Sequence, residues 1–195
     1  MSLQARKRKF YTPEEYLALE EKSEFRSEYV DGYIYKLAGG TEAHNDITLN
    51  IASQLKIKLR GRCKTFANDM KVWVEEAGTF FYPDVTVVCG ERKFYRDRCD
   101  IVENPILLIE VLSKSTDEYD KNDKFLIYRN IPSFQEYVLI SQNRPAVQQF
   151  NRQADGKWLH QATIGLNSKV YFESVDMELS LEDIYDLVEF EENNQ

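Results

Sequence analysis

The feature that most constrains the fold is a short apolar run that ends on an acidic residue. In "PILLIEVLSKST", residues 105–116, four aliphatic residues from Ile106 to Ile109 are followed directly by Glu110. The run predicts a strand that is buried on both faces. A carboxylate at the end of such a strand is costly to bury unless a proton, a cation or a metal compensates its charge. Any fold of this chain must therefore supply a partner for Glu110.

The segments around this strand predict a mixed β-sheet with helices on its faces. One helix is expected to begin at Thr12, which is a good N-cap before Pro13. The other expected helices cover residues 39–61, Ser115 or Thr116 to about Arg129, and 177–188. The expected strands cover residues 64–75, 79–90, 105–112 and 133–141, with hairpins at 26–38 and 146–165. This order predicts the α/β class, with an additional N-terminal hairpin and a C-terminal β-hairpin.

The length and continuity of the chain predict a single domain. Its 195 residues are an ordinary domain size, and the sequence contains no internal repeat or low-complexity segment. We expect one domain over residues 1–195. Its core lies at about 41–141, followed by a C-terminal hairpin and an acidic tail over 145–195.

The acidic residues are concentrated at one end of the chain. The formal net charge is −8, and residues 173–195 contain nine Asp or Glu residues and no Lys or Arg. Without those nine charges the body of the chain would carry a formal charge of +1. Net charge therefore gives no support for tight non-specific binding of DNA, although a near-neutral body can still carry a local basic groove.

The cysteines and the apolar runs bear on the cellular compartment. The three cysteines, at positions 63, 89 and 99, show no paired spacing, which argues against a disulfide framework or a zinc cluster and favours a reducing compartment. No apolar run is long enough to span a membrane. The basic residues 6–9 are not followed by the apolar stretch of a signal peptide. We expect a cytoplasmic protein without a membrane partner.

Two acidic residues stand beside apolar strands in the predicted core. Asp84 follows Pro83 before the run "VTVV", and Glu110 follows "ILLI". If both strands open at the same edge of the sheet, the two carboxylates can converge on one point, which is a hard oxygen site suited to Mg²⁺ or Mn²⁺. A metal there could activate a water and neutralise charge on a phosphodiester. The alternative is structural, with Asp84 in a turn and Glu110 in a salt bridge.

An ordered set of motifs resembles the Uma-type restriction endonuclease family of the PD-(D/E)XK nuclease superfamily. The chain contains "EYVDGYIY" at 28–35, "AHND" at 43–46, "YPDVTVV" at 82–88, "IEVLSKST" at 109–116, "DKNDKFLIY" at 120–128 and "EYVLI" at 136–140. The resemblance covers about residues 12–140. It implies a restriction-endonuclease-like fold and a Mg²⁺-dependent or Mn²⁺-dependent endonuclease, with Asp84 and Glu110 as metal ligands and catalytic residues. Glu28 would be a third acidic member.

The lysine of the superfamily motif is displaced in this sequence. The position two residues after Glu110 is occupied by Leu112. The resemblance makes Lys124, on the following helix, the candidate catalytic lysine. Lys114 is the rival because it has the strand parity of Glu110, and we rank Lys124 above it. The structural alternative for Lys124 is an exposed helix lysine paired with Asp120.

Two further features complete the candidate site. His44 lies in the first turn of a predicted helix and is a candidate catalytic residue, either as a general base or as a phosphate contact. A helix-capping role is its structural alternative. The loop "ERKFYRDR", residues 91–98, contains Arg92, Lys93 and Arg96 and is a candidate surface for binding the DNA backbone. Lys114 is a further candidate for substrate binding.

Three functions are compatible with these residues. The first is an endonuclease that hydrolyses DNA with Asp84, Glu110 and a lysine, acting as a homodimer because two-fold symmetric enzymes cut both strands. The second is a catalytically inactive DNA-binding or assembly protein with a nuclease fold. The third is a hydrolase of another phosphate ester, since the fold alone does not fix the substrate. No small-molecule cofactor is expected.

Overall fold

The strand that contains the apolar run and Glu110 lies inside a six-stranded mixed sheet. The computed structural model describes residues 9–113 and 120–190. In it, β8 (Leu107–Leu112) pairs in parallel with β9 (Glu136–Ser141) and antiparallel with β6 (Val85–Cys89). The strand order is β11-β10-β9-β8-β6-β3. The remaining strands of this sheet are β3 (Cys63–Ala67), β10 (Ala146–Arg152) and β11 (Trp158–Ile164).

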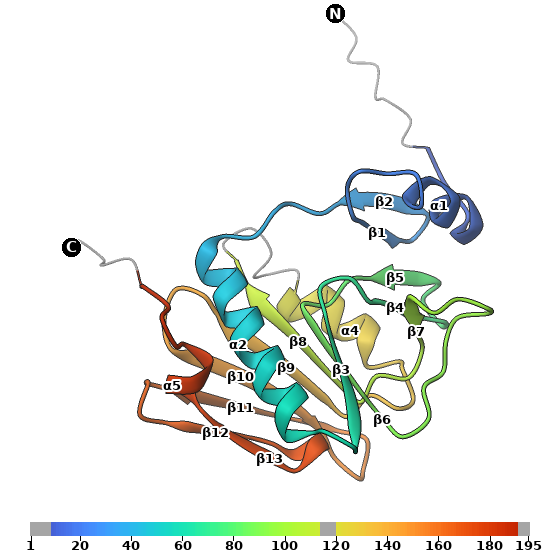
Figure 1. The fold of residues 1–195 in the computed structure, drawn as a ribbon. Helices are drawn as coiled ribbons and strands as arrows, with labels where there is room; N and C mark the ends of the chain where they lie inside the picture. The colour runs from blue at the N-terminus through green and yellow to red at the C-terminus, as the bar shows by residue number, and fades with distance from the viewer. Residues whose placement is uncertain (1–8, 114–119, 191–195) are drawn as a thin grey trace, which may run out of the picture.

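A second, five-stranded sheet packs beside the first (Figure 1). Its order is β2-β1-β5-β4-β7, and β7 pairs in parallel with β4. Its strands are β1 (Ser27–Val30), β2 (Tyr33–Lys36), β4 (Lys71–Val74), β5 (Thr79–Phe81) and β7 (Ile101–Val102). The predicted N-terminal hairpin is its β1–β2 edge, where Asp31 and Gly32 both adopt positive φ, as a two-residue hairpin turn requires.

Two segments predicted as continuous strands are each divided between the two sheets. Residues 64–75 form β3 and β4, and the break falls at Asn68, which has a φ of 58°. Residues 79–90 form β5 and β6, and the break falls at Pro83, which has no N–H to give to a ladder. The predictions of one strand each were therefore wrong. The division places Asp84 at the junction between the sheets.

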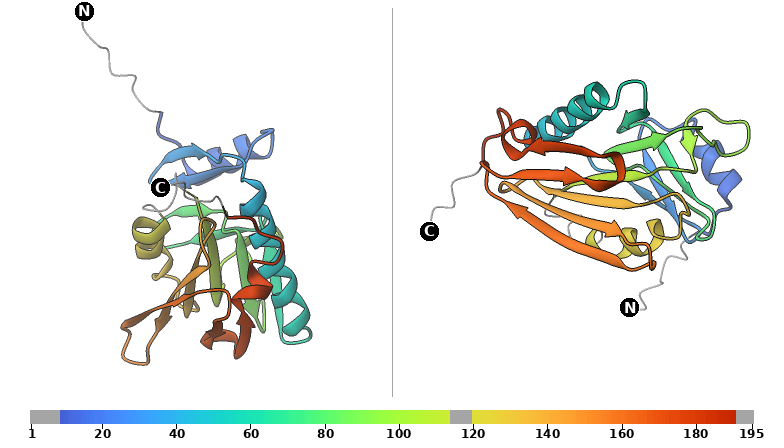
Figure 2. Two further views of the ribbon diagram at one scale, coloured as in Figure 1. Left: turned by 90° about the vertical axis from the view of Figure 1, so that its left-hand side faces the viewer. Right: turned by 90° about the horizontal axis from the view of Figure 1, so that it is seen from below.

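The described helices are distributed over both sheets, and the first of them packs against the five-stranded one. They are α1 (Pro13–Glu20), α2 (Glu42–Lys58), the π-helix η1 (Asp120–Lys124), α4 (Phe125–Tyr128), the 3-10 helix η2 (Glu173–Val175) and α5 (Leu181–Ile184). Figure 2 shows α2 and α4 on opposite faces of the six-stranded sheet. The predicted start of the third helix, at Ser115 or Thr116, lies outside the described residues.

The C-terminal part differs from the predicted short helix over 177–188. Its first residues form β13 (Met177–Ser180), which pairs with β12 (Lys169–Phe172), and only α5 is helical. Ser180 caps α5 by accepting a hydrogen bond from the backbone N–H of Asp183. The hairpin is favoured because alternate residues of these strands, such as Val170 and Leu179, are buried against the core while their neighbours are exposed.

The two faces of β8 belong to different cores. Leu107, Ile109 and Val111 pack with the buried stripe of α2, as the apolar periodicity of that helix predicted. Leu108 and Leu112 pack on the other face with the aromatic residues around α4. Glu110 shares the parity of this second pair, so its carboxylate points toward the side of the sheet that carries η1 and α4.

The cysteines correct the prediction that no disulfide forms. Cys63 and Cys89 lie opposite each other on β3 and β6 and form a disulfide, while Cys99 is free and exposed. Cys63 and Cys89 are 26 residues apart in the sequence, and only the pairing of β3 with β6 brings them together. The cysteine argument for a reducing compartment therefore no longer holds. Among the described helices, none has both the length and the apolar character needed to cross a membrane.

Candidate functional site

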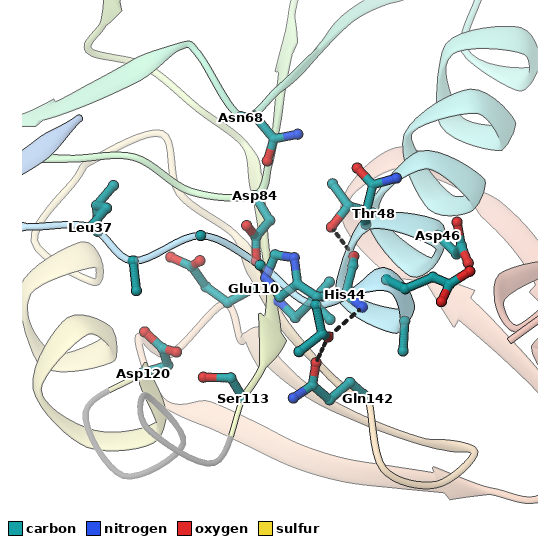
Figure 3. A pocket seen from close by; sticks show the side chains of 18 of the residues that line it. Leu37, His44, Asp46, Thr48, Asn68, Asp84, Glu110, Ser113, Asp120 and Gln142 are labelled. Carbon is teal, nitrogen blue, oxygen red and sulfur yellow. Dashed lines mark hydrogen bonds and ion pairs between the residues drawn. The ribbon is translucent and has the colours of Figure 1, made fainter. Parts of the chain in front are cut away.

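A cavity of about 1380 Å³ opens between the N-terminal turn of α2, the start of β6 and the C-terminal end of β8 (Figure 3). Residues 37–46, on the segment that leads from β2 into α2, form one wall. The carboxyl groups of Asp84, Glu110 and Asp120 lie on the same side of the cavity, and His44 lies beside them. The two carboxylates predicted from strand context therefore line one cavity.

Asp84 is held in place by the neighbouring strand. It occupies the break between β5 and β6, and its Oδ2 accepts a hydrogen bond of 2.7 Å from the backbone N–H of Val111 on β8. The same oxygen lies 3.2 Å from Nε2 of His44. Its side chain is 16% exposed, which leaves it accessible from the cavity. The division of the strand at Pro83 is what allows this carboxylate to reach β8.

Glu110 is paired with a buried lysine. Its Oε1 lies 3.2 Å from Nζ of Lys124 and accepts a hydrogen bond of 3.2 Å from the hydroxyl of Tyr128. Burial raises the pKa of Glu110 well above its usual value. Lys124 opposes this rise, and the nearby charges of Asp120, Asp84 and Glu28 add to it. The partner that the buried strand required is therefore an ammonium group.

Lys124 is at the centre of the charged cluster. It ends the π-helix η1, and its Nζ lies 3.1 Å from Glu28 and 3.2 Å from Asp120, in addition to its contact with Glu110. Burial alone would lower its pKa, but the three carboxylates outweigh burial and raise the pKa well above the usual lysine value. The structural alternative was wrong about exposure, because only 5% of Lys124 is exposed, but its pairing with Asp120 is present.

Glu28 and Asp120 complete the cluster from two other elements. Glu28, on β1, accepts a hydrogen bond of 3.2 Å from the backbone N–H of Tyr82, and its pKa is raised by burial despite the nearby Lys124. Asp120 begins η1, where the hydroxyl of Tyr137 donates to its carbonyl oxygen. Sequence reasoning named Asp120 only as a surface partner of Lys124. Their spacing of four residues was the available signal that the two groups act together.

His44 lies at the N-terminal end of α2. Thr41 caps this helix, since its hydroxyl oxygen accepts a hydrogen bond from the backbone N–H of His44. Gly40 leaves room for the imidazole, because a Cβ at that position would lie 3.0 Å from Nδ1 of His44. Burial would lower the pKa of His44, but the hydrogen bond and the charge of Asp84 outweigh it and raise the pKa. The Nε2 of the ring faces Asp84.

The predicted substrate-binding residues lie elsewhere. Arg92, Lys93 and Arg96 are exposed on the loop between β6 and β7, and none of them lines the cavity. Arg96 pairs with Glu14 of α1 at 2.6 Å. Lys114 lies outside the described residues. DNA contact by these side chains stays a prediction.

Arg26 lines the cavity and was missed by sequence reasoning. Its Nη1 donates a hydrogen bond of 2.8 Å to the carbonyl oxygen of Asn68, and its side chain is 45% exposed. Among the described residues that line the cavity, Arg26 and Lys124 are the two that carry a Lys or Arg charge. Its position directly before β1 gave no sequence signal, because its approach to Asn68 depends on the sheet topology.

The donor set of the cavity fits a hard divalent cation. The carboxylates of Asp84, Glu110 and Asp120 line the cavity together with Lys124 and His44, and Glu28 contacts Lys124 from behind the lining. Among the described residues, no three Asp, Glu, His or Cys side chains are close enough together to enclose a metal ion unaided. Mg²⁺ does not require such an enclosure, since it keeps several waters and uses one or two protein carboxylates. The carboxyl oxygens of Asp84, Glu110 and Asp120 are donors of the kind that such an ion binds.

Comparisons with known proteins identify a family and two similar proteins. The matching family model is Uma2, described as "Putative restriction endonuclease", over residues 13–183. Two proteins of Synechocystis sp. (strain ATCC 27184 / PCC 6803 / Kazusa) are similar. "Uncharacterized protein sll1609" is 39% identical over 165 residues, 84% of this chain and 93% of that protein. "Uncharacterized protein slr1290" is 33% identical over 178 residues, 89% of this chain and 90% of that protein.

A solved structure is similar in fold. It is the crystal structure of a "putative nuclease belonging to DUF820" from Anabaena variabilis ATCC 29413. The TM-score is 0.74 at 19% identity, and the match covers 89% of this chain and 97% of that chain. At that identity the likeness shows the fold. The predicted α/β class is confirmed, and the family match confirms the resemblance that the motifs indicated.

Proposed function

Because this chain belongs to the Uma2 family, described as "Putative restriction endonuclease", we propose that it is a metal-dependent endonuclease that hydrolyses DNA phosphodiester bonds. The observation that carries the proposal is the convergence of Asp84, Glu110 and Lys124 from three different elements on one cavity. These are the residues that the ordered motifs single out.

Asp84 and Glu110 would hold the metal, which we propose to be Mg²⁺ or Mn²⁺. Two carboxylates suffice because the remaining positions of such an ion are filled by water and by a substrate phosphate oxygen. When bound, the ion would acidify the attacking water and neutralise charge on the phosphate. Asp84 is well suited to this role, since its second oxygen, Oδ1, is not the one that Val111 and His44 engage.

The other side chains position the substrate and the carboxylates. Lys124 can direct its ammonium group toward the charge that develops on the phosphate. Arg26, at the exposed side of the cavity, can contact a neighbouring backbone phosphate with the donors that neither Asn68 nor Asp69 uses. We assign His44 to orienting Asp84, because its Nε2 already faces that carboxylate. Two such sites in a homodimer would cut both strands.

A second candidate function is a nuclease-fold protein that binds DNA or a partner without cutting. One observation favours it. The described lining of the cavity contains seven carboxylates, at positions 42, 46, 69, 84, 110, 120 and 189, against two Lys or Arg side chains. Without a divalent cation this lining repels a polyanion. The two functions therefore separate on whether a metal ion binds at Asp84 and Glu110.

Cleavage of supercoiled plasmid in the presence of Mg²⁺ or Mn²⁺ tests the proposal. We expect nicking by the wild type and a loss of about 100-fold or more in Asp84→Asn and in Glu110→Gln, because each loses a charged ligand. Asp97→Asn is the matched control, since Asp97 is exposed on the β6–β7 loop. Equal nicking by the site variants and the control would contradict the enzyme assignment.

A further inference from the structure

The ammonium group of Lys124 occupies a pocket of three carboxylates. Its Nζ lies 3.1 Å from Oε1 of Glu28, 3.2 Å from Oε1 of Glu110 and 3.2 Å from Oδ1 of Asp120. All four side chains are at most 7% exposed. Three carboxyl groups therefore face one ammonium group in a place that water hardly reaches.

One oxygen of this pocket has bonding capacity left. Oδ1 of Asp120 is buried and accepts no hydrogen bond, although it lies within ion-pair distance of Nζ. A buried carboxylate oxygen without a hydrogen bond is costly, and a cation beside it removes that cost. Asp120 also lines the cavity, so its side chain is close to the space from which an ion would enter.

The spacing of the oxygens suits an ammonium rather than a metal. Mg²⁺ binds oxygens at 2.0–2.1 Å, whereas the oxygens of the pocket lie 3.1–3.2 Å from Nζ. Glu110 is at once the partner of Lys124 and a proposed metal ligand. The ammonium group of Lys124 and a divalent ion bound to the same carboxylate would repel each other strongly. The two cations therefore compete for Glu110.

We propose that Lys124 is the resident cation of this pocket and that Glu110 exchanges it for the divalent ion. On this account Glu110 turns from the ammonium group to the metal, and Lys124 moves toward the cavity, where the substrate phosphate is expected. Loading with metal thereby releases the lysine for its role at the phosphate. The proposal rests on the proposed function in one respect, namely that a divalent cation binds at Asp84 and Glu110.

Titration with Mn²⁺ alone tests the competition. The variant Lys124→Met removes the charge but keeps the length of the side chain, and we expect it to bind Mn²⁺ about tenfold more tightly than the wild type, or better. Lys56→Met is the control, because Lys56 is exposed near the far end of α2 and its loss changes the net charge equally. Equal or weaker binding by Lys124→Met, relative to Lys56→Met, would overturn the exchange.

A measurement on the wild type covers the case in which Lys124→Met does not fold. Acetylation of lysines by acetic anhydride, followed by mass spectrometry, reports the accessibility of each amine. At a Mg²⁺ concentration that saturates the protein, we expect labelling of Lys124 to rise several-fold while that of Lys56 stays constant. Unchanged labelling of Lys124 under saturating Mg²⁺ would overturn the proposal.

These outcomes are distinct from those that test the enzyme assignment. If Lys124→Met binds Mn²⁺ more tightly but the wild type does not nick plasmid, the exchange stands and the endonuclease does not. If the wild type nicks plasmid and Lys124→Met binds Mn²⁺ no more tightly, the endonuclease stands and the exchange is wrong.

Discussion

At the scale of single residues, the site depends on a carboxylate that the fold buries at a strand end. The sequence indicated that Glu110 needs a compensating group, and the salt bridge given as its structural alternative is present. Its partner is Lys124, which the motif had indicated only as the candidate catalytic lysine. The sequence also indicated Asp84, because an acidic residue after Pro83 and before a β-branched run is unusual. What it could not indicate is the shared contact of Lys124 with Glu28, since β1 reaches η1 only through the packing of two sheets.

Arg26 allows a residue-scale prediction about substrate binding. In Ca²⁺, which should support binding without cleavage, we expect Arg26→Gln to weaken the affinity for a DNA duplex by about tenfold. The slope of log affinity against log salt should fall by about 1, because one phosphate contact is lost. Fluorescence anisotropy with a labelled duplex measures both quantities.

The comparison variant is Arg96→Gln, from the loop that the sequence favoured for DNA binding. Arg96 is exposed and pairs with Glu14, away from the cavity. We expect its affinity to stay within about twofold of the wild type, as for an ordinary surface position. The opposite ranking of the two variants would return the substrate contact to residues 91–98.

At the scale of elements, a buried ion-pair network fixes α1 to the five-stranded sheet. Nζ of Lys71, on β4, lies 3.0 Å from Glu20 at the end of α1 and 3.0 Å from Asp100 before β7. Lys71 and Glu20 are both nearly buried, and Tyr82 donates a hydrogen bond to Glu20. The sequence predicted α1 correctly but gave no sign of this attachment. The other two members of the network, Lys71 and Asp100, lie 51 and 80 residues after Glu20 in the chain.

We expect Lys71→Met to lower the free energy of unfolding by about 3–5 kcal/mol, because it leaves the carboxylate of Glu20 buried without its cation. Unfolding by urea, followed by circular dichroism, measures the change. The double variant Lys71→Met/Glu20→Gln should recover much of the loss, since the uncompensated charge is then removed. A loss below about 1 kcal/mol in the single variant would show that the network does not fix this helix.

Glu136 joins β9 to η2 through a buried carboxylate. Its Oε1 accepts from Gln149, and its Oε2 accepts from the backbone N–H and the hydroxyl of Ser174. Burial raises the pKa of Glu136 above its ordinary value of 4.5, although the hydrogen bonds of Ser174 and Gln149 oppose the rise. The folded protein therefore holds this proton to higher pH than the unfolded chain does.

The sign of the resulting pH dependence follows from this shift. As the pH rises above about 4.5, the unfolded chain loses the proton first, so the contribution of Glu136 to stability falls until the folded carboxyl has also titrated. We expect the melting temperature of the wild type, measured against Glu136→Gln at each pH, to be relatively highest near pH 4 and to decline toward pH 7. A constant difference between the two would contradict the raised pKa.

At the scale of the whole molecule, local patterns predicted the class of fold but not the division into sheets. Apolar periodicity placed α2, β8 and β9 correctly. The helix α2 packs one apolar stripe against the core, and the strands β8 and β9 are buried on both faces. The two-sheet arrangement was missed, since the breaks at Asn68 and Pro83 interrupt runs that remain apolar on both sides. The Cys63–Cys89 disulfide was missed for a related reason, because it depends on β3 and β6 being neighbours.

The central claim is that Asp84 and Glu110 share one divalent cation at the cavity between α2 and the ends of β6 and β8. The most direct measurement is an anomalous difference map from crystals of the wild type grown with Mn²⁺. The account predicts one strong peak at about 2.0–2.2 Å from a carboxylate oxygen of Asp84 and from one of Glu110. A map with no peak there, from crystals in which Mn²⁺ is bound at another place, would contradict it.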